Sequence, residues 1–185
     1  MINLNKLQID RSLEKKQTLN GLIKYQSLQN DLRRINIKKD NDFQKRFNNF
    51  YKVRRNSVWR DNFYTLLEEK KFIGITFSET LSFLYKSTGK YEVSFASKLV
   101  ATINDDLPII DKFVLLNTGL KIPYNNTKNR EVKINEIYEI LNQYIKNFKE
   151  SEEGIYLINK FKNYFPDFRI STTKMIDLVL WQTRK

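Results

Sequence analysis

Apolar residues recur at helical spacing along almost the whole chain, and this pattern constrains the fold more than any other feature of the sequence. In residues 128–149, Ile134, Tyr138, Leu141 and Ile145 fall on one face of a helix. Strong strand patterns are missing, and only five glycines and three prolines occur in 185 residues. The sequence therefore predicts an all-α protein, a compact single domain of about eight helices spanning residues 1–185.

Residues that cap helices mark several of the expected ends. Asp42 and Ser57 are each expected to cap the helix that follows, because their side-chain oxygens can accept a hydrogen bond from a first-turn N–H group. Thr76-Phe77-Ser78-Glu79 has the pattern of a capping box. Gly89 suits the left-handed residue that commonly ends a helix. The capping box therefore predicts a helix that ends just before Gly89.

Helix ends elsewhere in the chain are less clearly marked by the sequence. Residues 10–34 are expected to form one long helix. A later helix is expected to carry Pro108 in its first turn and to end near Gly119. Residues 1–9 are expected to form a mobile N-terminal arm.

The chain contains neither cysteine nor histidine, and this removes several classes of function. Disulfide frameworks, thiolate nucleophiles, imidazole bases and zinc sites built from these residues are excluded. The acidic residues do not stand at the spacing of metal ligands, so we expect no metal and no cofactor. The sequence has no apolar run of about 18 residues and no secretory signal at its N-terminus. We therefore expect a cytoplasmic protein that does not contact a membrane.

The net charge of +12 is concentrated at one end of the sequence. Residues 1–60 hold 15 Lys and Arg against 5 Asp and Glu, whereas residues 61–185 hold 18 against 16. Such a distribution is expected if one part of the fold binds a polyanion. Coding bias offers a second explanation, because Lys, Asn and Ile together make up 62 residues, as in a very AT-rich genome. That bias does not explain why seven of the ten arginines lie in the first 60 residues.

The densest basic segment runs from residue 51 to residue 60 and interleaves cations with two aromatic residues. Its cations are Lys52, Arg54, Arg55 and Arg60. They are candidates for contacts with nucleic-acid phosphates. Tyr51 and Trp59 could stack on bases, but their helical spacing from neighbouring aromatic residues favours positions in the core.

A second candidate segment runs from Ser87-Thr88-Gly89-Lys90 through Ser94-Phe95-Ala96-Ser97-Lys98 to Leu107-Pro108-Ile109-Ile110-Asp111. Over about residues 77–120, this arrangement resembles the helix-hairpin-helix DNA glycosylase superfamily. It is also similar to uncharacterised bacterial proteins that share the Ser-Phe-Ala-Ser-Lys and Pro-x-x-Asp pattern. The resemblance implies a hairpin at Gly89 whose backbone N–H groups face a DNA phosphate, with Lys90 and Lys98 as further nucleic-acid contacts. It also implies a catalytic carboxylate at Asp111.

The hairpin is degenerate, because the family normally carries Gly-x-Gly where this chain has only Gly89 followed by Lys90 and Tyr91. The lysine nucleophile of bifunctional members would fall near Val93 or Ser94, one turn before Lys98. Asp111 also has a purely structural interpretation, since an aspartate in the first turn of a helix stabilises its exposed N–H groups.

These observations favour a non-catalytic module that binds DNA or RNA, alone or within a nucleoprotein complex. One alternative is an inhibitor from a phage or other mobile element, which would bind the protein or guide RNA of a nuclease or an RNA-guided (CRISPR-type) defence complex. The other is a monofunctional DNA glycosylase-like enzyme with Asp111 as its carboxylate. A fold of this kind can host any of the three, and the sequence does not fix the oligomeric state.

Overall fold

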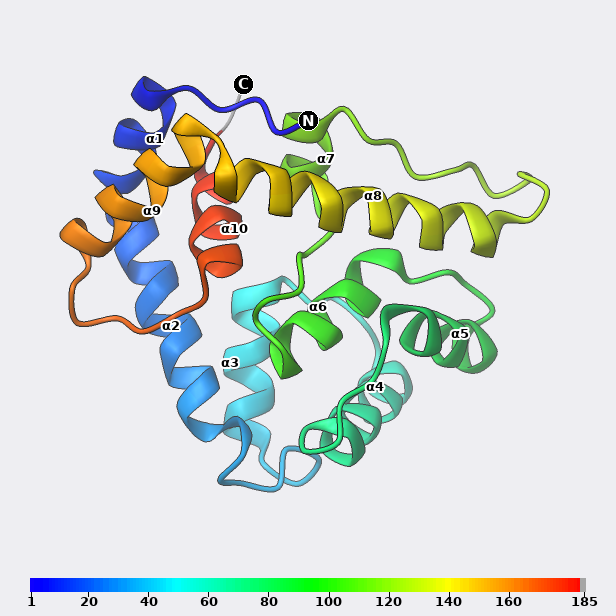
Figure 1. Cartoon of the computed structure of the whole chain (residues 1–185). Helices are drawn as coiled ribbons and strands as arrows, with labels where there is room; N and C mark the ends of the chain where they lie inside the picture. The colour runs from blue at the N-terminus through cyan, green and yellow to red at the C-terminus, as the bar shows by residue number, and fades with distance from the viewer. Residues whose placement is uncertain (184–185) are drawn as a thin grey trace. The chain divides into compact units, whose positions relative to one another are not determined.

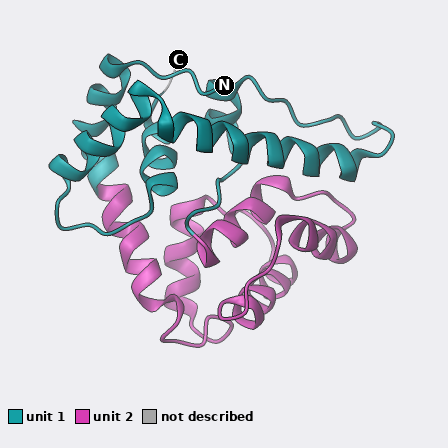
Figure 2. Ribbon diagram, in the orientation of Figure 1, with its two compact units in different colours: residues 1–19, 105–185 teal, residues 20–104 magenta. Residues whose placement is uncertain are grey.

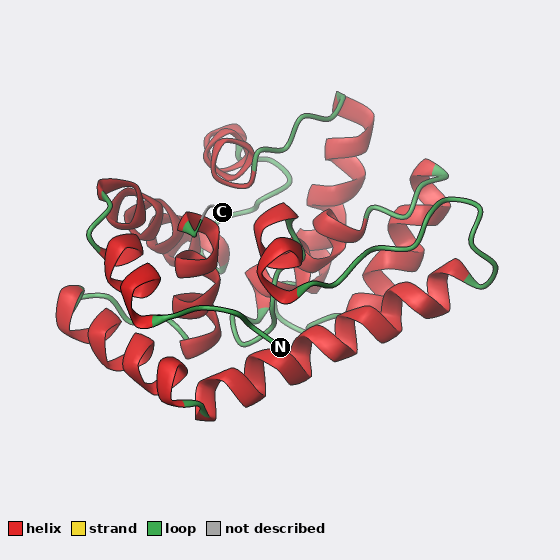
Figure 3. Cartoon of the chain, turned by 90° about the horizontal axis from the view of Figure 1, so that it is seen from above, coloured by secondary structure: helices red, strands yellow, loops and turns green. Residues whose placement is uncertain are grey.

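The elements of the protein, seen in a computed structural model that describes residues 1–183, are helices joined by loops (Figures 1 and 3). The prediction of an all-α protein is confirmed, with ten helices and no strand in these residues. The helices are α1 (Lys6–Leu13), α2 (Lys16–Leu32), α3 (Asn41–Tyr51), α4 (Ser57–Lys70), α5 (Phe77–Thr88), α6 (Val93–Ile103), α7 (Lys112–Thr118), α8 (Arg130–Glu150), α9 (Glu152–Tyr164) and α10 (Thr172–Gln182). Within the same residues, none of these helices combines the length and the hydrophobicity needed to cross a membrane.

The chain divides into two compact units (Figure 2). Unit 1 contains Met1–Leu19 and the segment from Asp105 onward, and unit 2 contains Asn20–Asn104. One boundary falls inside α2 and the other directly after α6. Neither boundary coincides with a linker rich in glycine, proline or serine, so no local sequence pattern marks this division.

The core of unit 2 is built mainly from aromatic side chains of α3 and α4. Phe47 lies at its centre, with ring centroids 4.6 Å from Tyr51 and 5.6 Å from Phe63. Trp59 extends the cluster to α6, since its ring centroid is 4.8 Å from that of Phe95. Phe47 and Phe63 are fully buried. The helical spacing of Tyr51 and Trp59 from neighbouring aromatic residues predicted a core position for both, and both are buried.

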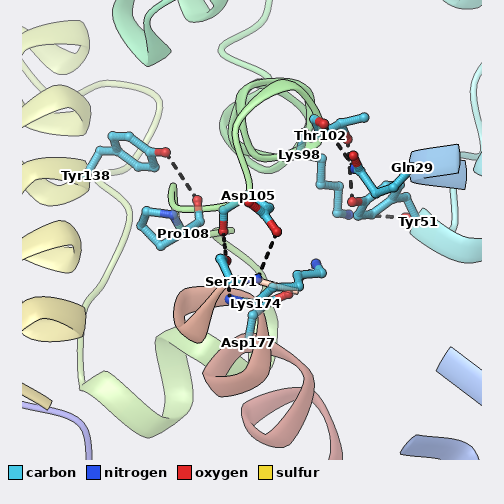
Figure 4. Close-up of polar contacts among 10 residues, drawn as sticks. All are labelled: Gln29, Tyr51, Lys98, Thr102, Asp105, Pro108, Tyr138, Ser171, Lys174 and Asp177. Atoms are coloured by element: carbon cyan, nitrogen blue, oxygen red, sulfur yellow. Dashed lines mark hydrogen bonds and ion pairs between the residues drawn. The ribbon is translucent and has the colours of Figure 1, made fainter. Parts of the chain in front are cut away.

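Unit 1 is organised around α10, which is buried along most of its length and packs against α1, α7, α8 and α9. The connection that precedes α10 is fixed by Ser171, whose backbone N–H donates to Asp105 Oδ2 at 3.0 Å (Figure 4). At the start of the chain, the side chains of Ile2 and Leu4 are buried, and the Asn3 N–H donates to the Asn117 carbonyl oxygen at 3.1 Å. The first residues of the expected arm are therefore packed and hydrogen-bonded.

The predicted helix ends around residues 76–89 are confirmed. Thr76 and Glu79 form a capping box, and the hydrogen bonds from Thr76 lower the pKa of the Glu79 carboxyl. Gly89 ends α5 in the left-handed region with φ of 69°. Its backbone N–H donates to the Tyr85 carbonyl oxygen at 2.8 Å. A non-glycine residue would be strained at this φ.

Three other predicted boundaries are wrong by a few residues. Asp40, not Asp42, caps α3, and its carboxylate accepts from the Phe43 N–H at 2.7 Å. Asn56, not Ser57, caps α4. The single helix expected over residues 10–34 is instead two helices, α1 and α2, which are separated between Leu13 and Lys16. For α3 and α4, a neighbouring residue whose side chain also carries an oxygen acceptor caps the helix in place of the predicted one.

The helix expected to carry Pro108 in its first turn begins only after that residue, at Lys112. Asp111 is its N-cap, and its Oδ1 accepts from the N–H groups of Phe113 and Val114 at 2.8 Å each. The expected end at Gly119 is confirmed, with a left-handed φ of 73°. Asp111 therefore has the structural role that its position near a helix start allowed.

Replacing this cap tests that role. We expect Asp111→Ala to lower the free energy of unfolding by about 1 kcal/mol, because two first-turn N–H groups lose their acceptor. Asp111→Ser should retain most of the stability, since its hydroxyl oxygen can accept the same kind of hydrogen bond. Urea denaturation followed by circular dichroism measures both changes. Equal stability of Asp111→Ala and the parent protein would contradict the role of this carboxylate as a cap.

Candidate nucleic-acid interface

The linker between α3 and α4 consists of residues 52–56, and hydrogen bonds hold it at both ends. At its start, Lys52 adopts a left-handed conformation with φ of 57°, and its N–H donates to the Asn48 carbonyl oxygen. Val53 is buried and its N–H donates to the same oxygen at 3.0 Å. At its end, Asn56 Oδ1 accepts from the Trp59 N–H at 2.9 Å. These contacts place Arg54 and Arg55 directly before the first turn of α4.

The hairpin between α5 and α6 consists of residues 89–92. Thr88 stabilises its turn, since its hydroxyl donates to the Leu84 carbonyl oxygen at 2.6 Å and accepts from the Lys90 N–H at 3.2 Å. The Lys90 side chain is exposed. Glu92 precedes α6 and is buried. The hairpin therefore exposes one cation and buries one carboxylate.

These two segments of unit 2 line one cavity of about 340 Å³. The linker and α4 contribute Arg54, Arg55 and Trp59, and the hairpin contributes Thr88, Lys90 and Glu92. The two segments that the sequence analysis selected separately, one for its charge and one for its hairpin pattern, therefore meet in the structure.

An ion pair joins the two segments. Arg55 Nη2 donates to Glu92 Oε2 at 2.9 Å, and the Glu92 side chain is only 10% exposed. The Arg55 guanidinium carbon also lies 5.0 Å from the centroid of the Phe95 ring and 5.9 Å from that of Trp59. Because its charge is compensated by a nearly buried carboxylate, Arg55 holds the linker against the start of α6 more than it offers charge to a ligand.

The uncompensated charge of the cavity comes from Arg54 and Lys90. Both side chains are exposed, and neither forms an ion pair or a side-chain hydrogen bond within residues 1–183. The first turn of α4 also borders the cavity through Asn56 and Val58. The N–H groups of a first helical turn have no acceptor within the helix, and Asn56 satisfies only that of Trp59. The cavity therefore combines two cations with the positive end of a helix, an arrangement that attracts anions.

Three further predicted contacts lie elsewhere in unit 2. Lys98 is buried, and its Nζ donates to the Tyr51 carbonyl oxygen at 3.2 Å, so it holds α6 to the end of α3 (Figure 4). Arg60 is partly exposed on α4 but does not line the cavity. Burial raises the pKa of the neighbouring Tyr64 hydroxyl, and the charge of Arg60 opposes that rise.

Lys52 lines a second hollow, of about 470 Å³, between α2 and α3. Its other lining residues include Lys24 and Asn49, which the sequence analysis did not select. Lys24 lies in α2 with no recognisable motif around it. Only its position in the same hollow as Lys52 identifies it as a candidate contact. The stacked rings of Tyr85 and Tyr91, with centroids 4.2 Å apart, were also missed.

Comparison with known proteins identifies no family for this chain. No family model matches the chain, and neither a curated protein nor a solved structure is significantly similar to it. In the part of the chain that the structure describes, no group of three or more acidic residues is placed to hold a metal ion.

The two adjacent arginines should respond differently to truncation. Arg55→Ala leaves the nearly buried Glu92 without its partner. Since the Arg55 side chain is 40% exposed, water compensates part of that loss, and we expect unfolding to become easier by about 1 kcal/mol. Arg54→Ala should leave the stability almost unchanged. Chemical denaturation of both variants measures the contrast, and equal stabilities would show that the Arg55–Glu92 pair does not hold the linker.

Proposed function

We propose that this protein binds nucleic acid without catalysing a reaction on it, through a surface on unit 2 centred on Arg54 and Lys90. One observation supports the proposal most strongly. Two uncompensated cations, from segments far apart in the sequence, line one cavity beside the first turn of α4. Phosphate groups are the ligands that such an arrangement of charge and N–H donors suits best.

The distribution of charge between the units supports the same surface. Unit 2, residues 20–104, holds 16 Lys and Arg against 8 Asp and Glu, whereas the remainder of the chain holds 17 against 13. Unit 2 therefore carries two thirds of the net charge in fewer than half of the residues. This excess of positive charge on unit 2 attracts a polyanion over a wider area than Arg54 and Lys90 alone.

The hairpin at Gly89 would act as a degenerate helix-hairpin-helix element. α5 and α6 pack against each other and are joined by only four residues, 89–92, as such an element requires. Tyr91 stands where the family pattern has its second glycine, and the neighbouring Lys90 would supply a charge where the family supplies a close backbone approach. The hairpin would therefore share a DNA- or RNA-binding role with the family that the sequence resembles, but not its enzymatic activity.

The non-catalytic form of the proposal rests on Asp111. Its Oδ1 accepts from the N–H groups of Phe113 and Val114, and these hydrogen bonds serve the start of α7. Capping a helix is a structural role, and it accounts for a carboxylate at this position without any catalytic function.

Removing the two cavity cations tests the proposal. We expect the parent protein to bind labelled oligonucleotides with an affinity that falls steeply with salt, because neutralised phosphates release counterions. The variant Arg54→Gln/Lys90→Gln should bind more weakly, and its slope of log K against log salt should be shallower by about 1.4–1.8, for two phosphate contacts. Fluorescence anisotropy at several salt concentrations measures both quantities.

A matched variant separates this site from the general charge of the protein. Lys38 and Lys39 are exposed in unit 2 and line neither hollow, so Lys38→Gln/Lys39→Gln removes the same charge elsewhere. We expect it to retain most of the affinity. If both double variants lose affinity equally, binding depends on net charge alone and the proposed site is wrong.

A further inference from the structure

The second hollow of unit 2, between α2 and α3, has the composition of a nucleotide subsite. Ile23, Lys24 and Ser27 of α2 line one side, and Arg46 and Asn49 of α3, with Lys52, line the other. Its volume of about 470 Å³ is within the range that accommodates ligands of nucleotide size. Ile23 is 50% exposed there, which provides an apolar surface beside the charged groups.

Only two of the three cations in this hollow are available to a ligand. Arg46 donates to Asp31 Oδ2 and Asp42 Oδ2, both at 2.7 Å, and to Ser27 Oγ at 2.8 Å. Its charge is therefore compensated. Lys24 and Lys52 are exposed and form no ion pair or side-chain hydrogen bond with any described residue. The hollow thus repeats the pattern of the first cavity, in which one arginine is held by carboxylate and two cations remain.

The chain places the two hollows next to each other. Lys52 lines the second hollow and Arg54 lines the first, and their Cα atoms can be at most about 7 Å apart because one residue separates them. That residue, Val53, is buried and anchors the linker to the core. The four uncompensated cations Lys24, Lys52, Arg54 and Lys90 therefore lie around one fixed linker.

From this arrangement, and resting on the function proposed above, we infer that the ligand is single-stranded nucleic acid and that it crosses the linker from one hollow to the other. Its phosphates contact Lys24, Lys52, Arg54 and Lys90. Its bases lie against the exposed apolar side chains of the two hollows, Ile23 in one and Val58, which is 69% exposed, in the other.

The groups that line the two hollows favour a single strand over a duplex. A duplex keeps its bases stacked inside the helix and presents mainly phosphates to a surface that does not enter its grooves. A single strand, DNA or RNA, presents bases and phosphates together, and protein grooves that bind it combine positive charge with exposed side chains against which the bases lie, most often aromatic rings. In the two hollows, the exposed aliphatic side chains of Ile23 and Val58 provide this apolar surface. The two hollows combine both kinds of group, so binding to a single strand uses contacts that a duplex cannot make.

The decisive experiment compares single-stranded DNA, single-stranded RNA and duplex DNA, each of about 16 nucleotides or base pairs, by fluorescence anisotropy at several salt concentrations. It uses the parent protein and three double variants, Lys24→Gln/Lys52→Gln, Arg54→Gln/Lys90→Gln and Lys38→Gln/Lys39→Gln. Glutamine keeps most of the side-chain length while removing the charge. Circular dichroism and the unfolding midpoint of each variant verify that the fold is retained.

We expect the parent protein to bind at least one single strand at least about fivefold more tightly than the duplex, and the DNA and RNA arms identify which. The Lys24→Gln/Lys52→Gln variant should lose about 1.4 from the salt slope for single strands, as the Arg54→Gln/Lys90→Gln variant should. Equal or tighter binding of the duplex overturns the inference, as does parent-like binding by Lys24→Gln/Lys52→Gln, even while the Arg54 and Lys90 variant still loses affinity. The absence of any binding by the parent protein at low salt overturns the proposed function itself.

Discussion

The candidate surface depends on the ion pair between Arg55 and Glu92. It joins residues that are 37 positions apart and holds the start of α4 against the start of α6. The Arg55 guanidinium lies over the rings of Trp59 and Phe95, so the charged contact is supported by the aromatic core of unit 2. At the cavity, this pair is a direct polar contact between the linker and the hairpin.

Contacts of this kind determine which charges remain for a ligand. Arg55 is compensated by Glu92, and Arg46 is compensated by Asp31 and Asp42. Lys98 is buried against the end of α3. A count of cations in the sequence treats all of these residues alike. The structure divides them into cations that hold unit 2 together and cations that face the solvent, and only the second group can contact phosphates without cost to the fold.

Local features of the structure were predictable from sequence, and long-range ones were not. The capping box at Thr76 and Glu79 and the left-handed Gly89 depend on hydrogen bonds within a few residues, so the local pattern suffices. The choice between Asp40 and Asp42 as a cap was missed because both offer the same acceptor. The meeting of Arg54 with Lys90 depends on packing between helices, and no spacing along the chain predicts it. Lys98 was selected from its hairpin context, which gave no information on its burial.

The proposed site requires that the linker and the hairpin form one phosphate-binding surface. A titration of the isotope-labelled protein with a short single-stranded oligonucleotide, followed by amide NMR, tests it most directly. We expect the amide signals of residues 54–58 and 88–90 to shift together, with one dissociation constant that increases as salt is raised. Shifts confined to one of these two segments, or to residues of unit 1, would contradict it.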